Sequence, residues 1–461
     1  MLVPKIEKSI GLEIYATSSS GIGGTIRENI EDFVVNEVLV DGSKAETYTP
    51  VEDEKRGALG ATLTTNRYLL CTLTKRNWDT FIAIKNIAHQ LGISPAQIHT
   101  AGIKDAKAVT SQFITVEGVS IEDAKNTNIK DISIRPIGYL RNKLSAYYLL
   151  GNNFHIRIAT MNLPKSAIRN RITKTIEELK TLGGIPNFFG HQRFGTTRPI
   201  THLVGKAIVR GNIKKAAMLL LAKPSPHEHP SSRQARQELQ KTQDFSRALQ
   251  NFPRQLRFER MMLESLVENP DDFIGAFRRL PIKLRELLIQ AYQSYLFNRF
   301  LSRRIKNGSS LNLAEVGDYV VNVERSGLPT QALHSNVSFG TLEQANSFIK
   351  TGKQRLAIAL PGFKQPLSQG AQGEIEKDIL EEEGVLPGNF KINEMPEMSA
   401  RGELRAIATP LRDFSLGKIS NEGTNKKKSS AEVSFTLYRS SYATVVLREL
   451  MKPRNPLKAR F

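Results

Sequence analysis

The chain has very little cysteine: Cys71 is the only one in 461 residues. A single thiol excludes a disulfide within the chain and a metal site built from several thiolates. Long hydrophobic runs are also missing, and none approaches the roughly 18 residues that a membrane-spanning helix needs. The opening MLVPKIEKSIGLEIYA lacks the charged and then apolar layout of a signal peptide. We therefore expect a cytoplasmic protein that does not enter a membrane.

Negative charge is scarce relative to positive charge. The chain carries 45 aspartates and glutamates against 65 lysines and arginines, a net charge of +20. This excess indicates a polyanionic partner, either a nucleic acid or an acidic membrane surface. A hydrophobic share of 40% and a charged share of 24% are ordinary for a soluble globular protein. The simplest class is a soluble, RNA-binding protein of two or three domains.

Local patterns predict alternating strands and helices in the first third of the chain and more helix after it. Asp79 or Thr80 caps a predicted helix that Gly92 ends. Apolar, β-prone runs predict strands near residues 68–74, 112–116, 132–138 and 154–159. Further helices are predicted over residues 164–182, 200–222 and 284–305. The pattern is typical of a mixed α/β fold.

Three later segments differ in composition. Residues 371–383 are acidic and predict a solvated helix, whereas residues 417–430 predict a mobile loop between strands. Residues 223–260 are polar and basic. We expect most of the arginines of this stretch to be exposed and to face RNA, including Arg233, Arg236, Arg247 and Arg254.

Two further patterns give weaker evidence of function. The His227-Glu228-His229 triplet has no suitable third ligand nearby, so a solvent-exposed loop is a better interpretation than a metal site. The run Gly21-Ile22-Gly23-Gly24 lacks the following Lys-Ser/Thr with which a nucleotide-binding loop grips phosphate and magnesium. We predict no metal site.

The segment AGIKDAKAVTSQ at residues 101–112 places Asp105 between Lys104 and Lys107. A carboxylate beside fixed cations stays ionised at neutral pH, and partial burial keeps it reactive. Such an aspartate serves as a nucleophile, a base or a metal ligand, although the lysines would repel a metal ion. A turn aspartate with solvated lysines is the structural alternative.

The segment NFFGHQRFG at residues 187–195 combines an amide, flat rings and an arginine in one loop. Asn187 can pair with the edge of a base, phenylalanine rings can stack on it, and Arg193 can bind phosphate. These are the groups that recognition of a single nucleotide requires. The structural alternative is a turn whose phenylalanines enter the core.

Both segments resemble the signature motifs of the tRNA pseudouridine synthase D (TruD) family. AGIKDAKAVTSQ is similar to A-G-x-K-D-x-x-A-x-T-x-Q, and NFFGHQRFG to N-[YF]-F-G-x-Q-R-F-G. Residues 24–37, 291–298 and 441–450 resemble further family segments in the same order. Two positions depart from the pattern: Ala106 replaces a frequent lysine, and Arg27 stands where bacterial relatives carry lysine.

The resemblance implies a mixed α/β pseudouridine synthase sheet with a family-specific domain inserted into it. The catalytic domain would comprise residues 1–197 and 401–461, and the inserted α/β domain residues 198–400. Residues 400–405 would return the chain to the catalytic sheet. The implied activity is isomerisation of uridine, at position 13 of tRNA, to pseudouridine, by a monomer that needs no cofactor. A non-catalytic RNA-binding protein or RNA chaperone, and a synthase acting on another RNA, are the alternatives.

The resemblance also implies roles for individual residues. Asp105 would be catalytic, and would either attack the anomeric carbon or remove the neighbouring sugar proton. Lys104 or Arg27 would supply the cation beside it. The implied substrate-binding residues are Phe33 and Phe189 against the uracil, Asn187 at the target nucleotide, and Lys104, Arg27 and Arg193.

Overall fold

The computed structural model describes residues 2–47, 58–422 and 425–461. Its largest sheet has eight strands in the order β13-β14-β6-β1-β4-β2-β5, with β3 beside β4. The mixed α/β class predicted from the sequence is confirmed. The strands are β1 (Phe33–Leu39), β2 (Tyr68–Arg76), β3 (Ile98–Thr100), β4 (Val109–Glu117), β5 (Ile132–Leu140), β6 (Leu149–Met161), β13 (Arg412–Glu422) and β14 (Asn425–Tyr438).

The centre of this sheet brings distant segments together. β1 pairs with β4 in parallel, with Val34 opposite Val109, and pairs with β6 in antiparallel fashion. The loop of residues 101–108 leads directly into β4. Because Val109 lies beside the start of β1, this loop is placed next to the segment that precedes β1. Asp105 and Arg27 therefore meet although 78 residues separate them.

The predicted helices around the sheet are present. Asp79 caps α2 (Thr80–Gln90), because its side chain accepts from the N–H groups of Phe81 and Ile82. Every residue of α14 is buried. The helices packed around the sheet are α1 (Lys5–Lys8), α2, α3 (Ile121–Lys125), α4 (Lys165–Thr181) and α14 (Ala443–Met451).

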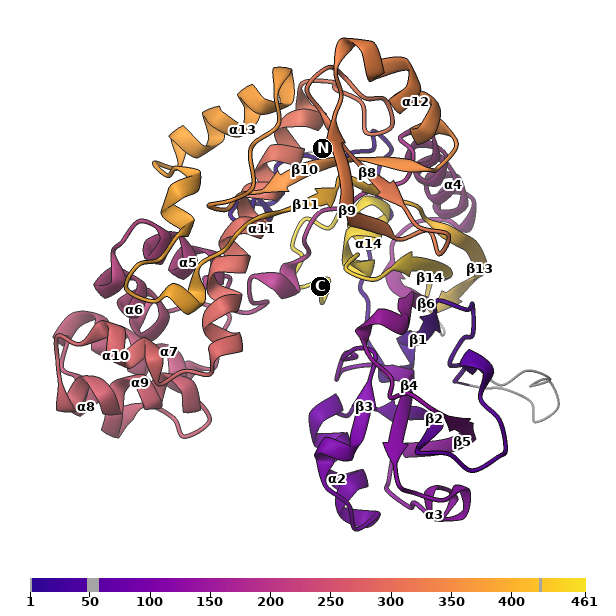
Figure 1. Ribbon diagram of the computed structural model, residues 1–461, viewed down its shortest axis with the longest axis horizontal. Coiled ribbons are helices and arrows are strands. Elements are labelled where there is room, and N and C mark those ends of the chain that lie inside the picture. Colours follow the sequence, from indigo (N-terminus) through magenta and orange to yellow (C-terminus); the bar gives the residue numbers. More distant parts are fainter. Residues whose placement is uncertain (1, 48–57, 423–424) are drawn as a thin grey trace.

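A helical lobe follows. In Figure 1 it projects to one side of the molecule, while β2–β5, α2 and α3 project as a second lobe. The predicted helical stretch of residues 200–222 forms two helices, because Gly211 adopts a φ of +73° between them. The lobe contains α5 (Thr201–Val209), α6 (Ile213–Ala222), α7 (Pro230–Thr242), α8 (Phe245–Asn251), α9 (Arg257–Glu268), α10 (Phe273–Arg278) and α11 (Ile282–Lys306).

A second, four-stranded sheet has the order β11-β10-β8-β9. It contains β8 (Tyr319–Val323), β9 (Pro329–Asn336), β10 (Gln354–Leu360) and β11 (Glu403–Ala406), with α12 (Leu342–Lys350) and α13 (Gly370–Glu382) nearby. The short strands β7 (Ile185–Pro186) and β12 (Ala408–Thr409) pair separately. Residues 403–406 thus join the small sheet rather than the eight-stranded sheet, which the chain re-enters at β13.

Two segments differ from the sequence predictions. Residues 417–422 and 425–430 belong to the paired strands β13 and β14, so the predicted loop is wrong for the described residues. The acidic segment does form a helix, α13, but it is not simply solvated. Ile375, Ile379 and Glu376 are buried, and Glu376 accepts hydrogen bonds from the N–H and hydroxyl of Ser368.

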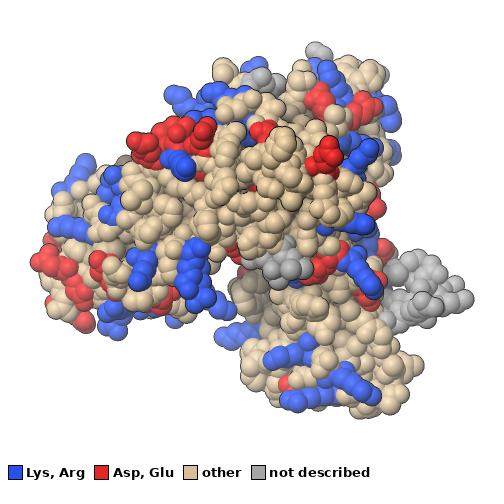
Figure 2. All heavy atoms as spheres, turned by 45° about the horizontal axis from the view of Figure 1, so that its top comes forward, with Lys and Arg blue, Asp and Glu red and all other residues tan. Residues whose placement is uncertain are grey.

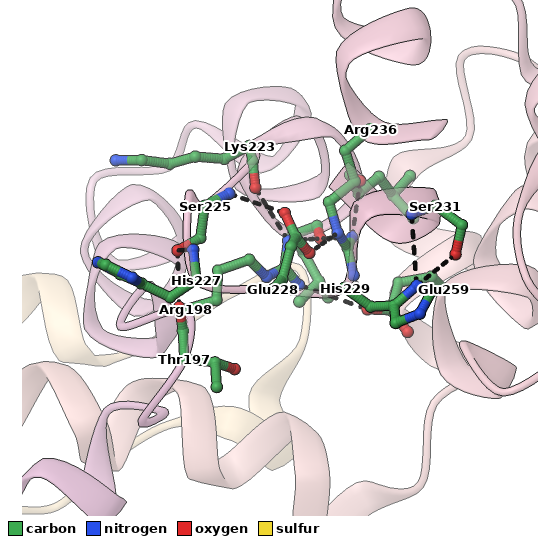
Figure 3. A network of polar contacts seen from close by, with 12 residues as sticks. Thr197, Arg198, Lys223, Ser225, His227, Glu228, His229, Ser231, Arg236 and Glu259 are labelled. Carbon is green, nitrogen blue, oxygen red and sulfur yellow. Dashed lines mark hydrogen bonds and ion pairs between the residues drawn. The ribbon is translucent and has the colours of Figure 1, made fainter. Parts of the chain in front are cut away.

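The basic stretch also contains a buried arginine. Arg236 of α7 is only 2% exposed, because its guanidinium pairs with Glu228 at 3.0 Å and Glu259 at 2.7 Å (Figure 3). Arg198 joins the same cluster through Glu259. The expectation that Arg236 faces RNA is therefore wrong. Residues 227–229 supply carboxylate to this network rather than a metal site.

Candidate active site

Asp105 lies in the loop between β3 and β4, and a buried lysine holds the backbone of this loop. Lys75 of β2 is 0% exposed, and its Nζ donates to the carbonyl oxygens of Trp78 at 2.6 Å and Asp105 at 2.9 Å. Burial lowers the pKa of Lys75 to about 8, against the opposing effect of the Asp105 and Asp79 carboxylates. No motif in the sequence singled out Lys75, because a lysine ending a strand usually faces solvent.

Arg27 supplies the cation beside Asp105. Its Nη2 lies 2.8 Å from Oδ2 of Asp105, and the two side chains are 18% and 50% exposed. The backbone of Arg27 has a φ of +57°, which is unusual for a residue with a side chain. This conformation aims the guanidinium at the carboxylate. Asp105 keeps half of its surface open to a substrate while its charge is paired.

Lys104, the other candidate for this cation, is directed elsewhere. Its Nζ forms an ion pair with Glu37 of β1, and both side chains are buried. Glu37 also accepts a hydrogen bond of 2.9 Å from the backbone N–H of Phe113. Lys104 and Asp105 are neighbours in the chain and point apart, so of the two candidates Arg27, and not Lys104, lies beside the Asp105 carboxylate. Lys104 instead anchors the loop to the sheet.

Phe33 lies beneath Arg27. The guanidinium carbon of Arg27 is 4.0 Å from the centre of the Phe33 ring, and Phe33 is only 1% exposed. The ring packs edge-on against Phe154. Arg27 therefore covers the ring that the sequence assigned to the uracil and holds the carboxylate at the same time.

Asn187 and Arg405 form a second group of contacts. Arg405 of β11 donates from Nη2 to the Asn187 side-chain oxygen at 2.9 Å and to the Ser440 carbonyl at 2.8 Å. Asn187 donates in turn to the Ala406 carbonyl at 3.0 Å, and its oxygen also accepts from Ser441. The amide is thus bonded to protein on both of its ends.

Phe189 and Arg193 line a cavity of about 510 Å³ beside this group. The guanidinium carbon of Arg405 lies 4.0 Å from the centre of the Phe189 ring, and that of Arg193 lies 5.7 Å from it. Arg193 donates to the Ser294 hydroxyl and the Gln290 side chain. Phe189 is 7% exposed and packs on Phe297, so it is both a core residue and part of the cavity wall.

One continuous hydrophobic core contains Phe33 of the first group and Phe189 of the second. Figure 2 shows a hollow between the two lobes, with lysine and arginine side chains on its rims. No group of His, Cys, Asp or Glu suited to a metal ion occurs in residues 2–47, 58–422 and 425–461. Over the same ranges, no helix is long and apolar enough to cross a membrane.

Comparison with known proteins gives a consistent picture. The family model of tRNA pseudouridine synthase D (TruD) matches residues 9–450. A protein of Methanosarcina acetivorans named "Probable tRNA pseudouridine synthase D" is 40% identical over 98% of this chain and 98% of its own length. One of Methanosarcina mazei with the same name is 38% identical over 99% and 100%. A crystal structure of a TruD protein from Methanosarcina mazei superimposes with a TM-score of 0.85, at 37% identity, covering 99% of this chain and 100% of its own.

Proposed function

This chain belongs to the tRNA pseudouridine synthase D family and is an isomerase that converts uridine in tRNA to pseudouridine, and we propose that Asp105 is its catalytic carboxylate. We further propose that uridine 13 is the principal target. The observation that carries the catalytic assignment is the pair of Arg27 and Asp105, with the carboxylate half exposed.

The reaction explains why this arrangement is useful. Isomerisation breaks the bond between the base nitrogen and the anomeric carbon, and joins carbon 5 of the uracil to the same sugar carbon. The proton on carbon 5 is released and nitrogen 1 gains one, so atoms balance and no redox cofactor is required. Asp105 either attacks the anomeric carbon or removes the neighbouring sugar proton. Both roles need the negative charge of the carboxylate, which forms an ion pair with Arg27.

The detached uracil has to stay in the site while it turns. Aromatic faces suit this task, because stacking holds a base without fixing its rotation in the plane of the ring. Phe33 and Phe189 are the rings assigned to it, and each is covered by an arginine 4.0 Å away in the free protein. The target nucleotide, flipped out of the tRNA, would replace a guanidinium on at least one ring.

The remaining assignments complete the proposal. Arg193 and Asn187 form the wall against which the nucleotide is placed, and Lys104 acts indirectly by holding the Asp105 loop. Residues 198–400 form the inserted domain, and the hollow between the lobes receives the tRNA. The enzyme acts as a cytoplasmic monomer without a cofactor.

Release of tritium from carbon 5 of labelled uridine in tRNA tests the proposal. The purified wild-type protein should release one tritium per tRNA, and a tRNA with cytidine at position 13 should release none. Release from both tRNAs would place the target elsewhere. Release from another RNA but not from tRNA would favour a synthase with a different substrate.

A further inference from the structure

A second cavity, of about 560 Å³, lies outside the two groups described above. Three segments line it: the glycine-rich loop of residues 21–25, residues 160–163 at the end of β6 and just after it, and the C-terminal stretch of residues 451–459. Arg171 of α4 also belongs to the lining. We refer to it as the C-terminal groove. The glycine-rich loop is the run that the sequence patterns left without a role.

The charge of the C-terminal groove is of one sign. Its lining contains four cations and no aspartate or glutamate: Arg171, Lys452, Arg454 and Lys458. Glu28 hydrogen-bonds the Thr25 hydroxyl at the rim but is not part of the lining. The charged side chains of the lining are therefore all cations, which favours an anion.

The four cations differ in whether groups of the protein already accept hydrogen bonds from them. Arg171 donates to the Gly21 carbonyl at 2.7 Å, and the buried Nζ of Lys452 donates to the Thr17 and Ser19 carbonyls. These two hold the groove together. Arg454 and Lys458 are exposed, and no carboxylate within the described part of the chain forms an ion pair with either. Their heads are available to a ligand.

The glycines give the groove a floor without side chains. A Cβ on Gly21 would lie 2.3 Å from the Met451 carbonyl, and one on Gly24 would lie 2.6 Å from the Ala159 carbonyl. These two glycines are needed for close packing. Gly23 has a φ of +67°, and a Cβ there would meet nothing within 4 Å, so this position opens into free space.

The groove adjoins the residues of the active site. Arg460 donates to the Arg27 carbonyl at 2.8 Å, and the N–H of Ile26 donates to the Ala459 carbonyl at 3.2 Å. One residue later, the Phe461 ring packs edge-on against His191 of the NFFGHQRFG segment. The C-terminal stretch thus connects the Arg27 segment with the second motif, and in Figure 1 it ends beside α14 between the two lobes.

We propose that the C-terminal groove binds a backbone phosphate of the substrate RNA, with Arg454 and Lys458 as its ligands. The proposal rests on the proposed function, since it takes tRNA as the substrate. A groove of one charge sign, two unpaired cations and an open glycine floor match a phosphate better than a base, because no flat ring lines it. The bound phosphate would position the strand next to Arg27 and Asp105.

Replacing Arg454 and Lys458 together by glutamine tests the ligands. Both are exposed, so folding should be unaffected. The tRNA Kd at low salt should rise roughly tenfold, and the slope of log K against log salt should fall by about one, as expected for one lost phosphate contact. The matched control is Lys377→Gln with Lys391→Gln. These lysines are equally exposed but lie on or after the acidic helix α13, and their removal should change neither quantity.

A second pair of variants changes Gly23, in the glycine floor of the C-terminal groove, without removing any cation. Asparagine and aspartate both tolerate the left-handed backbone of Gly23 and have nearly the same shape. Gly23→Asp places a negative charge in the groove and should weaken tRNA binding several-fold more than Gly23→Asn. Equal binding by the two variants would overturn the proposal.

The outcomes separate this proposal from the proposed function. If wild type releases tritium from tRNA but the Arg454/Lys458 variant keeps the wild-type Kd and salt slope, the groove proposal fails alone. If wild type shows no release from any tRNA, the proposed function fails. Should inorganic phosphate raise the Tm of wild type but not of the variant, while tRNA binding is equal, the groove holds a small free anion and the RNA proposal is overturned.

Discussion

Two arginine–phenylalanine pairs of the candidate active site, Arg27 with Phe33 and Arg405 with Phe189, differ in what surrounds them. In both, the guanidinium carbon lies 4.0 Å from the centre of the ring. Arg27, above Phe33, bonds the half-exposed carboxylate of Asp105. Arg405, above Phe189, donates to Asn187 twice and to the Ser440 carbonyl. The first pair presents a reactive group to solvent, whereas the arginine of the second is bonded to Asn187 and Ser440 and lines the cavity beside them.

The difference suggests a division of labour. Asp105 combines an adjacent cation with access, which a nucleophile or base requires. Asn187 is bonded to the protein through both its side-chain oxygen and its side-chain nitrogen, so it orders a wall rather than supplying a reacting atom. Arg405 belongs to β11 of the small sheet, whereas Asn187 follows β7, so this bond connects the small sheet with the NFFGHQRFG segment. We expect substitutions at the first pair to affect chemistry and those at the second to affect both stability and chemistry.

The largest effect among the supporting residues should come from Arg27→Gln. Losing a hydrogen bond to a charged group costs about 1.5–3 kcal/mol, so the single-turnover rate on saturating tRNA should fall roughly 10- to 150-fold. Arg27→Lys keeps the charge and should lose less. Both variants share the φ of +57°, so backbone strain is matched between them. A rate within twofold of wild type for Arg27→Gln would show that the cation is dispensable.

Phe189 allows the stacking role to be separated from the core role. Phe189→Ala should lose about 1–3 kcal/mol of base stacking and also leave a cavity against Phe297. Phe189→Leu refills most of the volume without a flat face. We expect the single-turnover rate to fall with both variants and the Tm to fall mainly with alanine. A leucine variant with a wild-type rate would make Phe189 an ordinary core residue.

Arg405→Gln tests the second pair, in which Arg405 lies over Phe189 and is bonded to Asn187. It removes donors from Asn187, which is buried, and from Ser440, which is exposed, so the free energy of unfolding should fall by about 1–3 kcal/mol. The single-turnover rate should fall about tenfold, because Asn187 and Phe189 lose their common partner. Arg405→Lys should rescue little, since an ammonium cannot reproduce the planar fork. Unchanged stability together with a changed rate would show that Arg405 acts on the substrate directly.

The smallest expected effect is the dependence of the single-turnover rate on pH. Because the pKa of Lys75 is lowered to about 8, its Nζ loses a proton as the pH rises past that value and holds the Asp105 loop with one donor fewer. The single-turnover rate should therefore decline a few-fold between pH 7 and 9. The effect of this group on stability has the opposite sign. Between pH 8 and about 10.4, the pKa of a lysine in the unfolded chain, the unfolded state binds more protons than the folded state. The free energy of unfolding therefore rises with pH in this range. In Lys75→Met the alkaline decline in rate should disappear.

The sequence predicted the elements whose signals are local, and missed those set by distant contacts. The Asp79 cap, the sheet strands and the two motifs were readable because their residues lie within a few positions of one another. The role of Arg405 could not be predicted from the sequence, because its partner Asn187 lies 218 residues away. The buried contacts of Lys75 and Lys104 could not be predicted from the sequence, because only the folded sheet decides whether a lysine points inward. Arg236 was misplaced for the same reason, since Glu228 and Glu259 meet it only in the packed lobe.

The most direct test of the central claim is turnover by Asp105→Asn. Asparagine keeps an oxygen for the bond from Arg27 and removes only the negative charge, so the fold and the tRNA contacts remain. Tritium release and tRNA Kd should be measured on the same preparation. The account predicts no release over many hours with a Kd within about threefold of wild type, because affinity comes mainly from phosphate contacts. Measurable multiple turnover by Asp105→Asn would contradict it and move the catalytic role to another residue.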